Sequence, residues 1–151
     1  MKILITGATG FVGQTLIPQL QKQHSQVDIL TLNRSVRKAE IMYPSDTYPC
    51  VKHTYADDWK QVKLFNPELV VHLAAFNTSS NDSEVINSLV STNITYGILL
   101  LDALSQCESL KLFINTGSFS EFVSIRPRAC FSPSYNKVKS QTKHVWLLTL
   151  L

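Results

Sequence analysis

Short apolar runs alternate with amphipathic segments along most of the chain. The apolar runs are typical of strands that are buried on both faces of a sheet. The amphipathic segments repeat apolar residues about every three or four positions, which predicts helices with one buried side. The predicted strands are residues 2–6, 27–32, 51–54, 69–73 and 110–114, and the predicted helices are residues 11–22, 36–42, 58–65 and 83–106.

This alternation indicates the fold class. Crossover connections between parallel strands are right-handed, so the helices cover both faces of one sheet. We therefore expect an α/β fold, a Rossmann-type doubly wound parallel sheet with helices on both faces. The chain has 151 residues, which suits one domain spanning residues 1–151. Residues 122–151 are an atypical tail with five basic and no acidic residues.

Composition limits the cellular compartments and the classes of binding partner that we expect. The three cysteines show no Cys-x-x-Cys pair and no metal-ligand spacing, so we expect neither a disulfide framework nor a metal site. Gly7 and Gly10 interrupt the apolar start short of a signal peptide or membrane span, which favours a cytoplasmic protein without a membrane partner. The basic tail lacks regularly interleaved aromatic residues, so we expect no nucleic-acid partner.

A glycine-rich loop joins the first predicted strand to the first predicted helix. Gly7 would allow a tight turn, Gly10 would let the backbone approach a pyrophosphate, and Gly13 would let the helix pack closely on the strand. The unpaired N–H groups at the start of the helix favour an anion. The pattern predicts a dinucleotide site formed here by Gly7, Thr9, Gly10, Phe11, Val12 and Gly13.

The loop resembles that of the extended short-chain dehydrogenases, the NAD-dependent epimerase/dehydratase family. Asp57 resembles the family's adenine-contacting acid, and Asn93 its structural asparagine. Leu73, Ala74 and Ala75 resemble its cofactor-lining turn. The resemblance implies an NAD(P)-dependent oxidoreductase or epimerase that acts on a nucleotide-sugar. It also implies a homodimer formed through residues 83–106 and a C-terminal helix.

The end of the second predicted strand bears on the choice of nicotinamide cofactor. An NAD-selective site usually has an acidic residue here to accept from the ribose hydroxyls, but the sequence reads Asn33-Arg34. Arg34, with Arg37 and Lys38 nearby, can instead hold the 2′-phosphate of NADP. We favour NADP and leave NAD open, because Asn33 can still bond a ribose hydroxyl.

The resemblance also implies a set of catalytic residues. It gives the hydroxyl role to Ser118, places Thr116 beside the nicotinamide, and assigns a proton-exchanging Tyr-x-x-x-Lys pair to Tyr135 and Lys139. A spacing of four puts that pair on one face of a helix, where the cation would lower the pKa of the phenol. His72 lies within an apolar strand and is predicted to pack rather than to react.

Two functions remain open from the sequence. The predicted helix after Pro133 has a weak apolar stripe, so a coincidental Tyr-x-x-x-Lys is one alternative. Family members continue with further strands and a substrate domain that these residues lack, so we expect a truncated chain. The first function is that of an enzyme. Asn33-Arg34 and residues 115–119 most resemble the corresponding segments of the CDP-sugar 4-ketoreductases. The second is a catalytically inactive NAD(P)-binding fragment.

Overall fold

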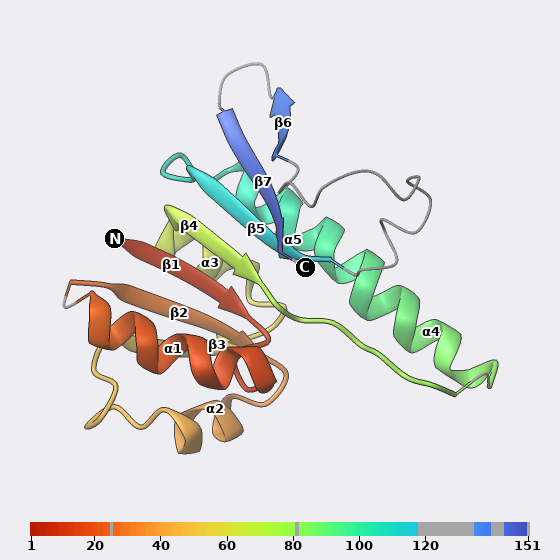
Figure 1. Ribbon diagram of the computed structural model, residues 1–151, viewed down its shortest axis with the longest axis horizontal. Coiled ribbons are helices and arrows are strands. Elements are labelled where there is room, and N and C mark those ends of the chain that lie inside the picture. Colours follow the sequence, from red (N-terminus) through yellow and green to blue (C-terminus); the bar gives the residue numbers. More distant parts are fainter. Residues whose placement is uncertain (25, 81, 118–134, 140–143, 151) are drawn as a thin grey trace, which may run out of the picture.

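One twisted sheet forms the centre of the molecule (Figure 1). The computed structural model describes residues 1–24, 26–80, 82–117, 135–139 and 144–150. The strand order is β3-β2-β1-β4-β5-β7-β6, and β1 to β5 are all parallel. The strands are β1 (Lys2–Thr6), β2 (Asp28–Asn33), β3 (Val51–Tyr55), β4 (Leu69–His72), β5 (Leu112–Thr116), β6 (Tyr135–Lys139) and β7 (His144–Leu150).

Helices cover both faces of this sheet, which confirms the predicted doubly wound fold (Figure 1). Alternate residues of β1 show the two layers. Ile3 and Ile5 belong to a core under α1 and α2, whereas Leu4 belongs to a second core under α3 and α5. The helices are α1 (Phe11–Gln23), α2 (Val36–Met42), α3 (Trp59–Phe65), α4 (Glu84–Val90), the π-helical η1 (Ser91–Thr95) and α5 (Tyr96–Ser105).

Local side-chain bonds explain where two of these helices begin. The Ser35 hydroxyl accepts a hydrogen bond from the Lys38 N–H at 3.3 Å and caps α2. The Asp58 carboxylate accepts from the Gln61 N–H at 3.1 Å and caps α3, as predicted. The hydroxyl of Thr54 donates to the same carboxylate at 2.6 Å. This bond, followed by the backbone bond from Gln61, lowers the pKa of Asp58.

The predicted helix at residues 83–106 is present as α4, η1 and α5 in direct succession. Leu100, Ala103 and Leu104 pack against the sheet. Glu84–Ser105 is long and apolar enough to cross a membrane by length and composition, which is weak evidence, because core helices pass the same test. Large apolar side chains on this helix are exposed, namely Ile86, Val90, Ile94, Ile98, Leu99 and Leu101.

The predicted C-terminal helix after Pro133 is wrong, because the structure has strand β6 at residues 135–139. Between Asn136 and His144 only Val138 is apolar, so a helix here would have no continuous face to bury. A strand needs only a backbone partner, and β6 pairs antiparallel with β7, which pairs parallel with β5. Among the described residues, the C-terminal segment therefore provides no second helix for the predicted dimer interface.

Candidate functional site

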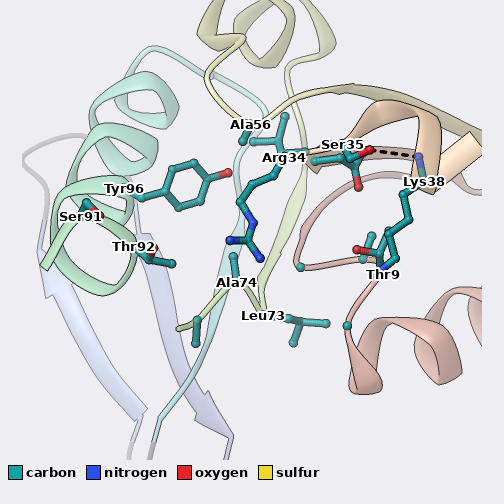
Figure 2. A pocket seen from close by; sticks show the side chains of 16 residues that line it. Thr9, Arg34, Ser35, Lys38, Ala56, Leu73, Ala74, Ser91, Thr92 and Tyr96 are labelled. Carbon is teal, nitrogen blue, oxygen red and sulfur yellow. Dashed lines mark hydrogen bonds between the residues drawn. The ribbon is translucent and has the colours of Figure 1, made fainter. Parts of the chain in front are cut away.

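A pocket of about 730 Å³ opens where β1, β2 and β4 end (Figure 2). The strand order reverses here, because the chain adds β2 on one side of β1 and β4 on the other. Open α/β sheets bind ligands in the crevice beyond the carboxyl ends of the strands at such a reversal. The predicted cofactor residues that line the pocket are Gly7, Thr9, Gly10, Asn33, Arg34, Leu73, Ala74 and Ala75.

Two glycines of the loop are required by close backbone contacts. Gly7 has a φ of +69°, and a Cβ atom there would lie 2.7 Å from the backbone nitrogen of Ala74. A Cβ atom on Gly13 would lie 2.3 Å from the carbonyl oxygen of Ala8. Gly13 does not line the pocket. Because Gly13 has no side chain, the backbone of Ala8 can approach α1 closely. The sequence predicted close packing at Gly13 but not its partner.

The start of α1 offers backbone groups rather than side chains. Gly10 precedes the helix and provides no side-chain cap for the first N–H groups. The side chains of Phe11 and Val12 are exposed, that of Phe11 by 91%, and neither residue lines the pocket. Any role of these two residues in binding an anion would therefore come from the N–H groups of the first helical turn.

The end of β2 combines one fixed amide with two cations. The Asn33 amide nitrogen donates to the Thr31 carbonyl at 3.0 Å, to the Thr31 hydroxyl at 2.7 Å and to the Thr54 carbonyl at 3.4 Å. These acceptors orient the amide and leave Oδ1 as an acceptor. Figure 2 shows the side chain of Arg34 extending into the pocket, which Lys38 also lines.

The end of β4 is tied to the end of β1 by a threonine hydroxyl. Thr6 Oγ1 accepts from the Ala74 N–H at 3.1 Å and lies 2.6 Å from His72 Nδ1, to which it can donate. His72 is buried, as predicted, between the rings of Tyr96 and Phe113 at 5.9 and 6.0 Å. Burial lowers the pKa of His72 and so favours the neutral ring, in which Nδ1 can accept this bond.

Asn93 holds the chain segment that follows β4. Its Oδ1 accepts from the Phe76 N–H at 2.7 Å, and its Nδ2 donates to the Phe76 carbonyl at 2.8 Å. Asn93 lies in η1, and single π-helical turns often occur at functional sites. The two bonds match the structural role that the resemblance implied for this residue.

Comparison with known proteins identifies the family. Residues 3–141 match the model of the NAD dependent epimerase/dehydratase family. The chain belongs to this family. It is 27% identical over 122 residues to the CDP-abequose synthase of Yersinia pseudotuberculosis, a match that covers 81% of the chain and 41% of that protein. It is 33% identical over 86 residues to an epimerase family protein of Arabidopsis thaliana, covering 57% of the chain and 24% of that protein.

Solved structures of epimerases and reductases share the fold. The UDP-glucuronic acid 4-epimerase of Bacillus cereus, solved with UDP-glucuronic acid and NAD, has a TM-score of 0.69 and 22% identity over 93% of the chain and 45% of that structure. Gre2 of Candida albicans, solved with NADPH, has a TM-score of 0.66 and 18% identity over 80% of the chain and 38% of that structure. The chain spans less than half the length of each of these relatives.

Tyr96 also lines the pocket, although the sequence analysis did not predict it as a site residue. It is the first residue of α5, and Figure 2 shows its phenol reaching toward Arg34. Burial raises the pKa of Tyr96, and the nearby charge of Asp57 raises it further. Asp57 is exposed and does not itself line the pocket. Other lining residues that were not predicted are Ala8, Leu32, Ser35, Ala56, Ser91 and Thr92.

The predicted catalytic residues are not gathered in the described part of the chain. Thr116, at the end of β5, donates to the His72 carbonyl at 3.2 Å and does not line the pocket. Ser118 lies outside the described residues. Tyr135 and Lys139 are the first and last residues of β6. Four residues span about 13 Å along a strand but about 6 Å along a helix, so β6 does not bring the pair together as a helix would.

Proposed function

We propose that the pocket binds a nicotinamide dinucleotide, with NADP preferred over NAD. The observation that carries the proposal is the contact between the glycine loop and the turn at residues 73–75, where only a glycine fits at Gly7. This contact places the start of α1 at the crevice, where its N–H groups and positive dipole end favour a pyrophosphate. The structural relatives were solved with NAD or with NADPH, which supports the cofactor class but not the choice between them.

The preference for NADP rests on charge at the end of β2. Arg34 and Lys38 line the pocket, and the position that an NAD-selective site gives to an acid is held by Asn33. A guanidinium can form charge-assisted hydrogen bonds to a 2′-phosphate that a 2′-hydroxyl cannot match. Oδ1 of Asn33 can accept from a ribose hydroxyl, so we expect weaker but measurable binding of NAD.

A titration of the 151-residue chain with NADPH and NADH, followed by fluorescence, tests this proposal. Arg34→Ala should weaken NADPH about tenfold or more, the value of one lost charge-assisted bond, and should change NADH little. Arg37→Ala is the matched control, because Arg37 is exposed on α2 and does not line the pocket. Failure of the unaltered chain to bind either dinucleotide would refute the proposed function. Equal weakening of both by Arg34→Ala would refute the preference for NADP.

We further propose that the chain takes part in oxidation, reduction or epimerisation of a nucleotide-sugar, and most specifically in 4-keto reduction of a CDP-sugar. The similarity to CDP-abequose synthase supports the narrower reaction. In this proposal Ser118 polarises the sugar oxygen, Tyr135 exchanges the proton and Lys139 lowers the pKa of that phenol. Tyr135→Phe should then abolish NADPH oxidation by a CDP-4-keto sugar while leaving the Kd for NADPH unchanged.

A second proposed function, dinucleotide binding without turnover, is favoured by one observation. The Tyr-x-x-x-Lys segment is strand β6 rather than a helix. Under this alternative the unaltered chain binds NADPH but oxidises none of it in the presence of a CDP-4-keto sugar. Turnover that Tyr135→Phe leaves unchanged would instead exclude Tyr135 as the proton donor.

The proposed homodimer rests on the exposed apolar side chains of Glu84–Ser105. Three of them, Ile94, Ile98 and Leu101, follow one another at spacings of four and three residues, and all are more than half exposed. Equilibrium sedimentation of the unaltered chain and of Ile94→Glu tests this interface, because a buried charge should convert a dimer to monomers. Cytoplasmic location stays a prediction from the sequence.

A further inference from the structure

Tyr43 is a rigidly held residue that directly follows α2. Its side chain is buried, with only 2% of the residue exposed. The ring packs edge-on against Tyr48 at 5.3 Å and is stacked near His53 at 6.2 Å, both measured between ring centroids. The backbone is held as well, because Nε2 of His53 donates to the Tyr43 carbonyl at 3.2 Å. The ring of Tyr43 therefore has little freedom to move.

The hydroxyl of this side chain reaches the glycine loop. Tyr43 Oη donates to the carbonyl oxygen of Ala8 at 2.8 Å, and Ala8 is fully buried. The same oxygen would lie 2.3 Å from a Cβ atom on Gly13, so it is closely confined between α1 and Tyr43. Burial, with a smaller effect of Tyr48, raises the pKa of Tyr43 to about 12. The phenol therefore keeps its proton, and remains a donor, at neutral pH.

The bond from Tyr43 to Ala8 also determines the direction of the next N–H group, that of Thr9, because both belong to one peptide unit. The peptide unit is planar and trans, so the carbonyl of Ala8 and the N–H of Thr9 point in opposite directions. Because the carbonyl points inward to Tyr43, the N–H of Thr9 points away from the core, and Thr9 lines the pocket. Among the described residues, the Thr9 N–H has no hydrogen-bond acceptor.

We propose that Tyr43 is a positioning residue for the dinucleotide, whose hydroxyl fixes the Ala8–Thr9 peptide so that the Thr9 N–H is directed at the pyrophosphate. The inference rests on the proposed function and adds to it a residue that touches no cofactor. It also connects two parts of the site. The segment that carries Arg34 and Lys38 ends at Tyr43, so the groups expected at the 2′-phosphate and the glycine loop are held by one short segment.

Tyr43→Phe removes the hydroxyl and keeps the ring. We expect it to raise the Kd for ADP, which contains the pyrophosphate, about five- to tenfold. The Kd for adenosine 2′-monophosphate, which lacks the pyrophosphate, should not change, with both measured by displacement of NADPH. Tyr48→Phe is the matched control, because it removes a hydroxyl from the same aromatic cluster without touching Ala8, and should change neither Kd. Equal weakening of both ligands by Tyr43→Phe would indicate a general packing defect and would overturn the proposal.

A measurement on the unaltered chain covers the case in which Tyr43→Phe does not fold. In ¹⁵N-labelled protein, saturating ADP should move the Thr9 amide proton downfield, as a new hydrogen bond to phosphate requires, and adenosine 2′-monophosphate should not. A Thr9 amide that does not respond to bound ADP would overturn the proposal. ADP binding that is unchanged in folded Tyr43→Phe would overturn this inference alone. No binding of ADP or NADPH by the unaltered chain would overturn the proposed function together with it.

Discussion

Gly7→Ala should be among the most damaging single substitutions in the glycine loop. The φ of +69° at Gly7 costs a residue with a Cβ atom about 1–2 kcal/mol. The added atom would also lie 2.7 Å from Ala74 N and Leu73 C, which are backbone atoms that cannot rotate away. Overpacking of this kind costs about 1–3 kcal/mol more. We therefore expect the free energy of unfolding to fall by about 2–5 kcal/mol, a large part of the roughly 5–15 kcal/mol of a typical domain.

Gly10→Ala provides the comparison within the same loop. Gly10 has an ordinary φ of −84°, and its added Cβ atom would meet only the Gly7 carbonyl oxygen, at 3.1 Å. Exchange of glycine for alanine at a helix N-cap costs about 1 kcal/mol or less. Urea unfolding followed by tryptophan fluorescence measures both variants. If Gly7→Ala proves no less stable than Gly10→Ala, the close contact between the loop and the turn at residues 73–75 is wrong.

Three further predictions concern other parts of the structure. Because burial lowers the pKa of His72 from 6.5, the unfolded chain binds more protons than the folded chain below about pH 6.5. The free energy of unfolding, measured in urea across pH, should therefore fall as the pH drops below that value, and His72→Gln should reduce this dependence. Asn93→Ala removes two exposed hydrogen bonds to the backbone of Phe76, whose groups can then bond water, and should cost about 0.5–1.5 kcal/mol in the same assay. Leu104→Ala, in the core under α5, should cost about 2–5 kcal/mol but leave the ratio of the Kd values for NADPH and NADH unchanged.

Most elements of residues 1–117 could be predicted because they carry their own local signals. The cap at Asp58 and the stop at Asn66, which adopts a φ of +50°, give the bounds of α3 without any knowledge of the fold. The π-helical turn at Ser91–Thr95 could not be predicted. Apolar residues spaced three or four apart fit an α-helix with or without one extra residue in a turn, so the pattern does not distinguish them.

In the candidate site, too, the residues with a local sequence signal could be predicted, and those placed by contacts between distant residues could not. The glycine loop could be predicted because its spacing and its place between strand and helix are both visible in the sequence. The bond from Tyr43 to Ala8 joins residues 35 positions apart, and no local pattern encodes it. Tyr96 was missed for a related reason. Helical periodicity assigns it to a helix, but its burial beside His72 and Trp59 depends on how that helix packs on the sheet.

The Tyr-x-x-x-Lys segment shows why a short motif needs its secondary structure. A spacing of four places two residues on the same side of both a helix and a strand, because it is close to one helical turn and equals two strand repeats. Only the helix also brings their backbones close enough for an ammonium to act on a phenol. The weak apolar stripe between Asn136 and His144 argued against a helix from the start, and β6 agrees with it. An active enzyme of this family with Tyr135 and Lys139 in catalysis would therefore require this segment to be helical when cofactor is bound. Far-ultraviolet circular dichroism with and without NADPH can detect that change.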